Sequence, residues 1–228
     1  MKKNSKRKTK FLKKIDFKKK YTIEEGIKLL KKISSVNFTE SLDIILKLGI
    51  DPKKSDQNIR GTTILPHGIG KKMKIVVFSQ GKNALIAKEN GADFVGAEDL
   101  LKKIQNKEIK FDIVIASPDT MHIVGKISSI LGPRGLMPNP KLGTVTENIK
   151  NSIKNFKNGQ IRYKNEKNGI LHTTIGKINF PVENLKNNFI TLLESIKRLK
   201  PTTSKGIFIK KIFFSTTMGP AITIDSIL

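Results

Sequence analysis

Residues 73–116 read MKIVVFSQGKNALIAKENGADFVGAEDLLKKIQNKEIKFDIVIA, and this stretch decides the fold of the middle of the chain. Two continuous apolar runs, within residues 74–79 and 112–116, are typical of parallel strands that are buried on both faces. Between them the pattern predicts a helix over 83–90, a short strand over 93–95 and a helix over 98–107. Alternating strands and helices predict a small open α/β sheet with helices on both faces.

The segment that follows this sheet pattern is rich in glycine and proline. Pro118 stands at the favoured first-turn position of a helix that we expect to run to about Ile130. Residues 131–146, LGPRGLMPNPKLGTVT, then predict an ordered irregular loop, because Leu and Met residues interrupt the glycines and prolines as apolar anchors. The loop carries Arg134 and Lys141 and no acid, so it is either a structural connection or a rigid basic loop presented to an anion or a partner.

The N-terminal part of the chain predicts a capped helix followed by a half-buried strand. Thr22 and Glu25 form a capping-box pattern ahead of a helix over 23–33. Within residues 37–50, apolar residues alternate with Ser41, Asp43 and Lys47, which gives the strand one face that is free for contacts.

The C-terminal part returns to the same two patterns. We expect a strand from residue 160, a hairpin turn at Asn168–Gly169, and a return strand over 170–180. A helix begins at Pro181 and ends before Pro201, and strands over 206–215 and 221–224 flank the turn T-T-M-G-P.

Charge is the strongest global property of the chain. The formal net charge is +25, and an excess of this size favours a polyanionic partner, with nucleic acid ahead of an anionic membrane. Residues 1–20 are strongly basic and are either a solvated tail or an RNA-contacting arm. The absence of Cys excludes disulfides and zinc–thiolate sites, and no apolar run approaches the roughly 20 residues needed to cross a bilayer.

The sequence offers no catalytic or metal-binding constellation and points to no cofactor. The segment 61–71 lacks the spacing of a phosphate-binding P-loop, and no Ser or Thr follows its lysine. His67, His122 and His172 are far apart, and Asp119 is better explained as a first-turn charge on a helix. We therefore predict that the protein is not an enzyme.

These patterns combine into a two-domain, discontinuous architecture of mixed α/β class. An outer split α+β domain is expected over 1–66 and 159–228, and an inserted three-layer, Rossmann-like α/β domain over 67–158. Gly68, Gly70 and Gly159 lie at the two connections and are candidate hinge residues.

Three blocks of sequence are similar to one known family. GTTILPHGIGK at 61–71, residues 111–146, and STTMGP at 215–220 resemble the L-one family of large-subunit ribosomal proteins, of bacterial or organellar type. The resemblance implies the same split architecture and one ribosomal-RNA surface on the outer domain. The positions that it assigns to this surface are Phe38, Ser41, Asp43, Lys167, Gly169, His172, Lys205, Thr217, Met218 and Gly219. Arg134 and Lys141 are weaker RNA contacts of the inner domain.

The family resemblance also implies a function. Such proteins bind ribosomal RNA at the mobile lateral stalk, assist release of deacylated tRNA from the exit site, and repress translation of their own mRNA. We therefore expect a free monomer that works in the cytoplasmic ribosome, or in an organellar stroma or matrix, without a membrane partner. Two alternatives are a phosphate-ester hydrolase, which needs convergent acids or a metal, and a DNA-binding repressor, which needs an exposed recognition helix.

Overall fold

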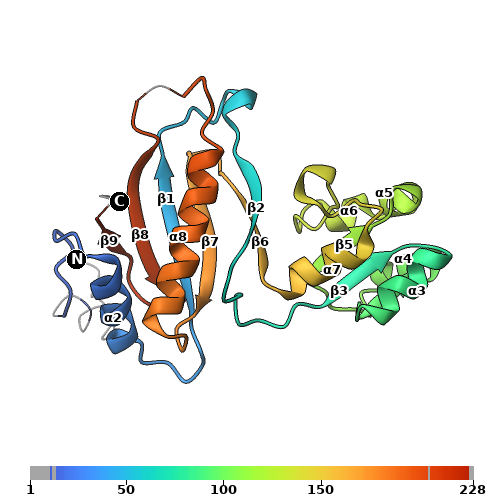
Figure 1. The fold of residues 1–228 in the computed structure, drawn as a ribbon, viewed down its shortest axis with the longest axis horizontal. Coiled ribbons are helices and arrows are strands. Elements are labelled where there is room, and N and C mark those ends of the chain that lie inside the picture. Colours follow the sequence, from blue (N-terminus) through green and yellow to red (C-terminus); the bar gives the residue numbers. More distant parts are fainter. Residues whose placement is uncertain (1–10, 12–13, 205, 226–228) are drawn as a thin grey trace, which may run out of the picture. The chain divides into compact units, whose positions relative to one another are not determined.

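The computed structural model describes residues 11, 14–204 and 206–225 (Figure 1). These residues form two compact units. The outer unit contains the described residues up to Gly70 and from Ile161 onward, and the inner unit contains Lys71–Gln160. Most of the predicted basic arm over 1–20 lies outside the described residues. Within the part of the chain that is described, no helix is long and apolar enough to span a bilayer.

The outer unit is built on a four-stranded sheet with the strand order β7-β1-β8-β9. Its neighbouring strands are all antiparallel. The strands are β1 (Ser41–Leu48), β7 (Ile170–Lys177), β8 (Ile209–Thr216) and β9 (Ile222–Ile224). Figure 1 shows the long helix α8 (Val182–Arg198) lying across this sheet.

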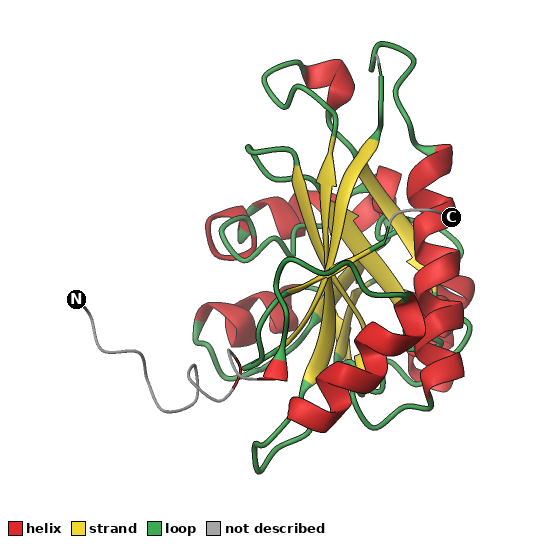
Figure 2. Ribbon diagram, turned by 90° about the vertical axis from the view of Figure 1, so that its left-hand side faces the viewer, coloured by secondary structure: helices red, strands yellow, loops and turns green. Residues whose placement is uncertain are grey.

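Two helices cover one face of the outer sheet. In helix α2 (Ile23–Ile33) the predicted capping box is present, because the Thr22 hydroxyl accepts from the Glu25 backbone N–H while the Glu25 carboxylate accepts from the Thr22 N–H. From α8, the ring of Phe189 meets that of Phe214 of β8 edge-on, with the centroids 5.0 Å apart. Buried and partly exposed residues alternate along β1, so the sheet has a helix-covered face and an open face. Figure 2 shows the strands in yellow and the helices in red.

The return strand was predicted with the wrong partner. Strand β6 (Gln160–Lys164) pairs with β2 (Arg60–Ile64) in a separate two-stranded sheet, whereas β7 pairs with β1. The two sides of the turn are joined by an isolated bridge between Asn165 and Leu171 and by the Glu166 N–H, which donates to the Ile170 carbonyl at 2.8 Å. The pairing is non-local in sequence, so the turn dipeptide could not reveal it. Strand β7 also ends earlier than predicted, at Lys177, and β8 begins later, at Ile209.

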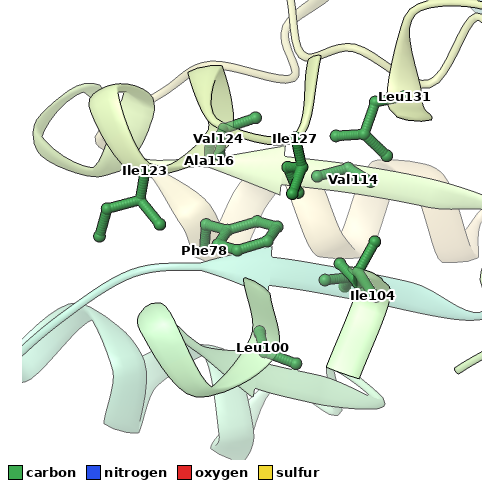
Figure 3. Close-up of a cluster of buried hydrophobic side chains, with 10 residues drawn as sticks. Phe78, Leu100, Ile104, Val114, Ala116, Ile123, Val124, Ile127 and Leu131 are labelled. Atoms are coloured by element: carbon green, nitrogen blue, oxygen red, sulfur yellow. The ribbon is translucent and has the colours of Figure 1, made fainter. Parts of the chain in front are cut away.

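The inner unit has the predicted three layers. Its parallel sheet has the order β4-β3-β5, with β3 (Ile75–Phe78), β4 (Phe94–Gly96) and β5 (Ile113–Ala116). Helices α3 (Lys82–Glu89) and α7 (Ile149–Lys157) pack on one face. Helices α4 (Glu98–Gln105), α5 (Met121–Gly125) and α6 (Ser128–Leu131) pack on the other (Figure 3). The mixed α/β fold class is confirmed.

The helix predicted from Pro118 to about Ile130 is broken into three pieces. A 3-10 turn at Pro118–Thr120 precedes α5, and α6 follows after an interruption. At that interruption the N–H groups of Lys126 and Ile127 bond to carbonyls three residues back, at 3.1 Å each. Such tightened bonds end an α-helix, and the glycine at residue 125 weakens continuation further.

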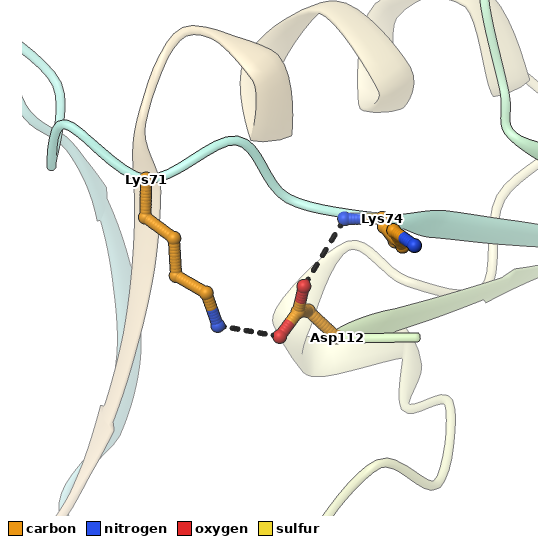
Figure 4. A network of polar contacts seen from close by, with 3 residues as sticks. All are labelled: Lys71, Lys74 and Asp112. Carbon is orange, nitrogen blue, oxygen red and sulfur yellow. Dashed lines mark hydrogen bonds and ion pairs between the residues drawn. The ribbon is translucent and has the colours of Figure 1, made fainter. Parts of the chain in front are cut away.

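One aspartate ties the start of the inner unit to its edge strand. Asp112 accepts from the Lys71 ammonium at 2.6 Å and from the Lys74 backbone N–H at 3.1 Å (Figure 4). Burial by itself raises the pKa of Asp112, but the hydrogen bonds from Lys71 and Lys74 outweigh it and hold the pKa below its ordinary value. The ionised carboxylate therefore stabilises the folded inner unit.

Candidate nucleic-acid interface

The open face of the outer sheet carries the polar half of the β1 alternation. Leu42, Ile44, Leu46 and Leu48 are buried, whereas the residues between them are partly or fully exposed. The strand register sets Thr174 and Ser215 on either side of Asp43, and His172 and Phe213 on either side of Ile45. Period-two patterning therefore places residues from three strands on one surface.

The start of β1 meets the turn that follows β8. The Ser41 backbone N–H donates to the Thr217 hydroxyl oxygen at 3.0 Å, and the Thr217 N–H donates to the Ser41 carbonyl at 3.2 Å. Phe38 and Met218 are exposed beside this contact, at 52% and 51%. We call Phe38, Ser41, Asp43 and residues 217–219 the turn cluster. The structure brings Ser41, Asp43 and residues 217–219 together at one end of the sheet, and Phe38 lies three residues before Ser41 in the sequence.

The turn itself has a fixed shape. The Gly219 N–H donates to the Thr216 carbonyl at 3.1 Å. A side chain at Gly219 would clash with the buried Thr216 hydroxyl, so this position requires glycine. The turn therefore exposes Thr217 and Met218 in a defined direction and does not act as a flexible hairpin loop.

Two polar residues of this surface were not predicted. The Thr174 hydroxyl donates to the Asp43 carboxylate at 2.6 Å. The Lys177 ammonium donates to the Ser41 hydroxyl at 2.9 Å. The period-two pattern from His172 indicates Thr174, because alternate residues of a strand share a face. Lys177 gives no such signal, because the register shifts between Leu42 and Asp43.

Other predicted contacts lie toward the opposite end of β1. The Gly169 carbonyl accepts from the Leu48 N–H at 2.9 Å, and Lys167 is exposed in the same turn. Counting along β1 at roughly 3.4 Å a residue, Leu48 lies about 24 Å from Ser41. His172 is exposed between the two ends, with its Nε2 atom 3.9 Å from a Glu166 oxygen. Lys205 lies outside the described residues.

The inner-unit candidates sit on an anchored loop. Leu136 and Met137 pack against the core cluster that includes Leu131, which agrees with the expected ordered loop. Arg134 and Lys141 are both exposed, and Lys141 lies in a 3-10 turn over Pro140–Leu142. Both cations are therefore accessible to an anionic partner.

The candidate hinge glycines have backbone angles that favour glycine. Gly68, Gly70 and Gly159 have φ of 64°, 73° and 92°. The Gly68 carbonyl accepts from the buried Asn188 amide at 3.0 Å. A side chain at Gly70 would crowd the Phe180 ring. These contacts hold the 68–70 segment within the outer unit.

The described residues contain no group of three His, Cys, Asp or Glu side chains that could hold a metal ion. Ser117 and Asp119, at the carboxyl edge of the inner sheet, do not form a catalytic pair. The Ser117 hydroxyl is buried against that of Thr120, at 3.2 Å, and Asp119 is exposed.

Fold, charge and surface together are typical of nucleic-acid-binding proteins. A basic chain presents a one-sided antiparallel sheet whose open face carries hydroxyls, an amide-rich turn and one carboxylate.

Comparison with known proteins places the chain within one family of this class. Residues 30–220 match the model of the ribosomal protein L1p/L10e family, and the chain belongs to that family. This confirms the predicted resemblance. The family consists of structural ribosomal proteins, so the prediction that the chain is not an enzyme is also confirmed.

Several bacterial relatives are similar over nearly their whole length. The large ribosomal subunit protein uL1 of Pasteurella multocida is 57% identical over 211 residues, which cover 92% of this chain and 92% of the relative. The protein of the same name from Haemophilus influenzae strain PittEE is 56% identical, with the same coverage. That of Aliivibrio salmonicida is 53% identical over 225 residues, which cover 99% of this chain and 96% of the relative.

Proposed function

We propose that this protein is a structural component of the large ribosomal subunit and binds ribosomal RNA through the open face of the outer sheet. The observation that carries the proposal is the reciprocal pair of hydrogen bonds between Ser41 and Thr217. This pair joins the two halves of the turn cluster, in which Thr217 and Met218 are exposed. The net charge of +25 supplies the long-range attraction to phosphate.

The hydrogen-bonding groups of the turn cluster are suited to RNA. The Thr217 oxygen already accepts from Ser41, so its hydroxyl proton is left to donate to a ribose or phosphate oxygen. Asp43 accepts from Thr174 with one oxygen, and its other oxygen can accept from a ribose 2′-hydroxyl or a base amine. Folded RNA is recognised mainly by shape and 2′-hydroxyls, which matches this mixture better than a fork of arginines would.

The wider role that we propose follows the family resemblance. The target is the RNA of the mobile lateral stalk, and the outer unit carries the main binding surface. The inner unit adds contacts through Arg134 and Lys141. The candidate hinges are Gly68, Gly70 and Gly159. The protein assists release of deacylated tRNA from the exit site. Free protein is a monomer in the cytoplasm and represses its own mRNA by binding a leader that mimics the ribosomal site.

RNA affinity measured across a salt series tests the binding proposal. Wild-type protein is titrated with its own stalk RNA and with an unrelated hairpin of equal length. We expect a preference of about 10³ or more for the stalk RNA at physiological salt. Equal affinities that collapse together as salt rises would mean that charge alone drives binding, and would overturn the proposal.

Substitution of Thr217 tests the proposed surface directly. Thr217→Val removes the hydroxyl and with it the acceptor of the exposed Ser41 N–H. We expect stalk-RNA affinity to fall about tenfold with only a small decrease in the thermal midpoint of the outer unit. Thr191→Val is the matched control, because its hydroxyl bonds to the Asn187 carbonyl within α8. Unchanged affinity in Thr217→Val, or an equal loss in both variants, would contradict the assignment.

The two finer roles need separate measurements. Arg134→Ala with Lys141→Ala should slow tRNA departure from the exit site while leaving stalk-RNA affinity within about threefold. A reporter that carries the protein's own leader should lose repression with Thr217→Val. Normal tRNA departure in the first case, or retained repression in the second, would remove that role and leave RNA binding intact.

A further inference from the structure

We infer that Glu40 is a positioning residue for the RNA surface, which it serves by holding the 216–219 turn in its binding shape. The inference rests on the proposed RNA-binding function. Glu40 lies between the predicted contacts Phe38 and Ser41, yet it cannot touch RNA itself, because it is 0% exposed. Its effect on a ligand must therefore pass through the residues that it holds.

The burial of this carboxylate is unusual within the molecule. Among the described residues, Glu40 is the only Asp or Glu in the buried class. A carboxylate removed from water destabilises the fold strongly unless hydrogen-bond donors replace the lost water. A buried acid one residue before the open-faced strand therefore needs a compensating set of donors, and the structure supplies one.

The donors come from two separate segments. The Met218 backbone N–H donates to one carboxylate oxygen at 2.8 Å. The Ser34 hydroxyl donates to the other oxygen. Ser34 is the C-cap residue of α2, and its own N–H bonds to the Leu30 carbonyl. One side chain thus ties the end of a helix to the turn that lies 178 residues further along the chain.

The turn depends on this tie for its orientation. Its three consecutive backbone N–H groups are all bonded, and those of Thr217 and Met218 find their acceptors in Ser41 and Glu40. Without the Glu40 oxygen, the Met218 N–H would lose its acceptor and the turn would be held on one side only. The exposed Met218 side chain and the Thr217 hydroxyl would then lose their fixed direction. Pre-organisation of this kind lowers the entropy cost of binding.

Three variants separate the role of hydrogen bonding from the role of charge. In Glu40→Gln the amide oxygen still accepts from Met218, and the amide N–H can donate to the Ser34 oxygen. We expect this variant to retain stalk-RNA affinity within about threefold. Glu40→Ala leaves both donors without an acceptor, and we expect a loss of about ten- to a hundredfold. Asn188→Ala is the matched control, because Asn188 is also 0% exposed and bonds to backbone groups at His67, Gly68 and Ile175.

A double-mutant cycle distinguishes positioning from general destabilisation. If Glu40 acts through the turn, Glu40→Ala should weaken binding far less in a Thr217→Val, Met218→Ala background than in the wild type. A purely structural residue would give the same loss in both backgrounds. Affinities are measured in the full-length protein at a temperature where circular dichroism shows every variant to be folded.

The outcomes separate this inference from the proposed function. If the wild type prefers stalk RNA, and Glu40→Ala retains that preference or loses no more than Asn188→Ala, Glu40 has no positioning role. Additive losses in the cycle, or failure of Glu40→Gln to retain affinity, would overturn the inference in the same way. If the wild type shows no preference, the proposed function fails first.

Discussion

The two sheets of this molecule bury their side chains in different ways. In the inner unit, every residue of β3 and β5 is buried, because helices cover both faces of the parallel sheet. In the outer unit, β1 alternates between buried and partly exposed residues, because α2 and α8 cover one face only. The inner sheet therefore has two packed faces, and the outer sheet has one packed face and one free face.

This difference limits where a ligand can bind. A sheet covered on both faces can offer only its edges and loops, as the anchored loop with Arg134 and Lys141 does. A sheet with one bare face can present side chains from several strands at fixed spacing, as Asp43, Thr174 and Ser215 are presented. The outer sheet is therefore the better platform for a large folded ligand.

The largest expected effect comes from threonine substitutions, which test whether the two sheets differ in the number of packed faces. Thr keeps the β-branched shape but buries a hydroxyl, so Val114→Thr and Ile115→Thr should each lower the free energy of unfolding by about 1–3 kcal/mol. Their side chains belong to opposite layers of the inner unit. In β1 we expect a similar loss for Ile44→Thr and less than about 1 kcal/mol for Ile45→Thr. Urea unfolding of all four variants measures this, and equal losses for Ile44→Thr and Ile45→Thr would show that the open face is not open.

A smaller effect is expected on the pH dependence of the unfolding free energy of the inner unit. The pKa of Asp112 is lower in the folded state than in the unfolded chain, so its stabilisation is present above the unfolded pKa of about 4 and is lost as pH falls through the folded pKa. Asp112→Asn should therefore reduce the difference in unfolding free energy of the inner unit between about pH 6 and about pH 3. Asp119→Asn serves as the control, because Asp119 forms no ion pair among the described residues. An unchanged pH dependence in Asp112→Asn would show that the ionised Asp112 carboxylate does not stabilise the inner unit.

The smallest effect concerns cations at the far end of the open face. Lys47 and Lys211 are exposed and lie opposite each other on β1 and β8. If RNA extends along the open face, Lys47→Gln and Lys211→Gln should each reduce the slope of log affinity against log salt by about 1, with no change in thermal midpoint. Lys102→Gln, on α4 of the inner unit, should leave the slope unchanged. Equal slopes in all three variants would confine the RNA to the turn cluster.

Local patterns in the sequence predicted most of the fold. The capping box at Thr22, the alternation in β1 and the apolar runs of β3 and β5 each depend on neighbouring residues, and each appears in the structure. One error was local, since the helix predicted from Pro118 is broken into three pieces. The error in strand pairing concerns distant partners. Nothing near Asn168 or Gly169 indicates that β7 pairs with β1 and not with β6, because that choice depends on which strand the rest of the outer core places beside it.

The candidate site was harder to predict for the same reason. Alternation placed Ser41 and Asp43 on a free face, but only the structure shows Thr217 bonded to Ser41 across 176 residues of sequence. Glu40 gave no signal at all, since a lone acid beside a strand usually lies in solvent. Its burial depends on donors that come from elsewhere in the chain.

The contact between Ser41 and Thr217 also has a consequence for the order of events during synthesis. One half of the turn cluster is made early, and the other half follows 176 residues later in the sequence. The turn cluster therefore stays incomplete on the translating ribosome until residues 217–219 have been made. The inner unit is a continuous segment that can fold earlier, because its contacts do not depend on the C-terminus. A chain that stops just short of residue 217 thus carries every Lys and Arg of this sequence but lacks half of the turn cluster.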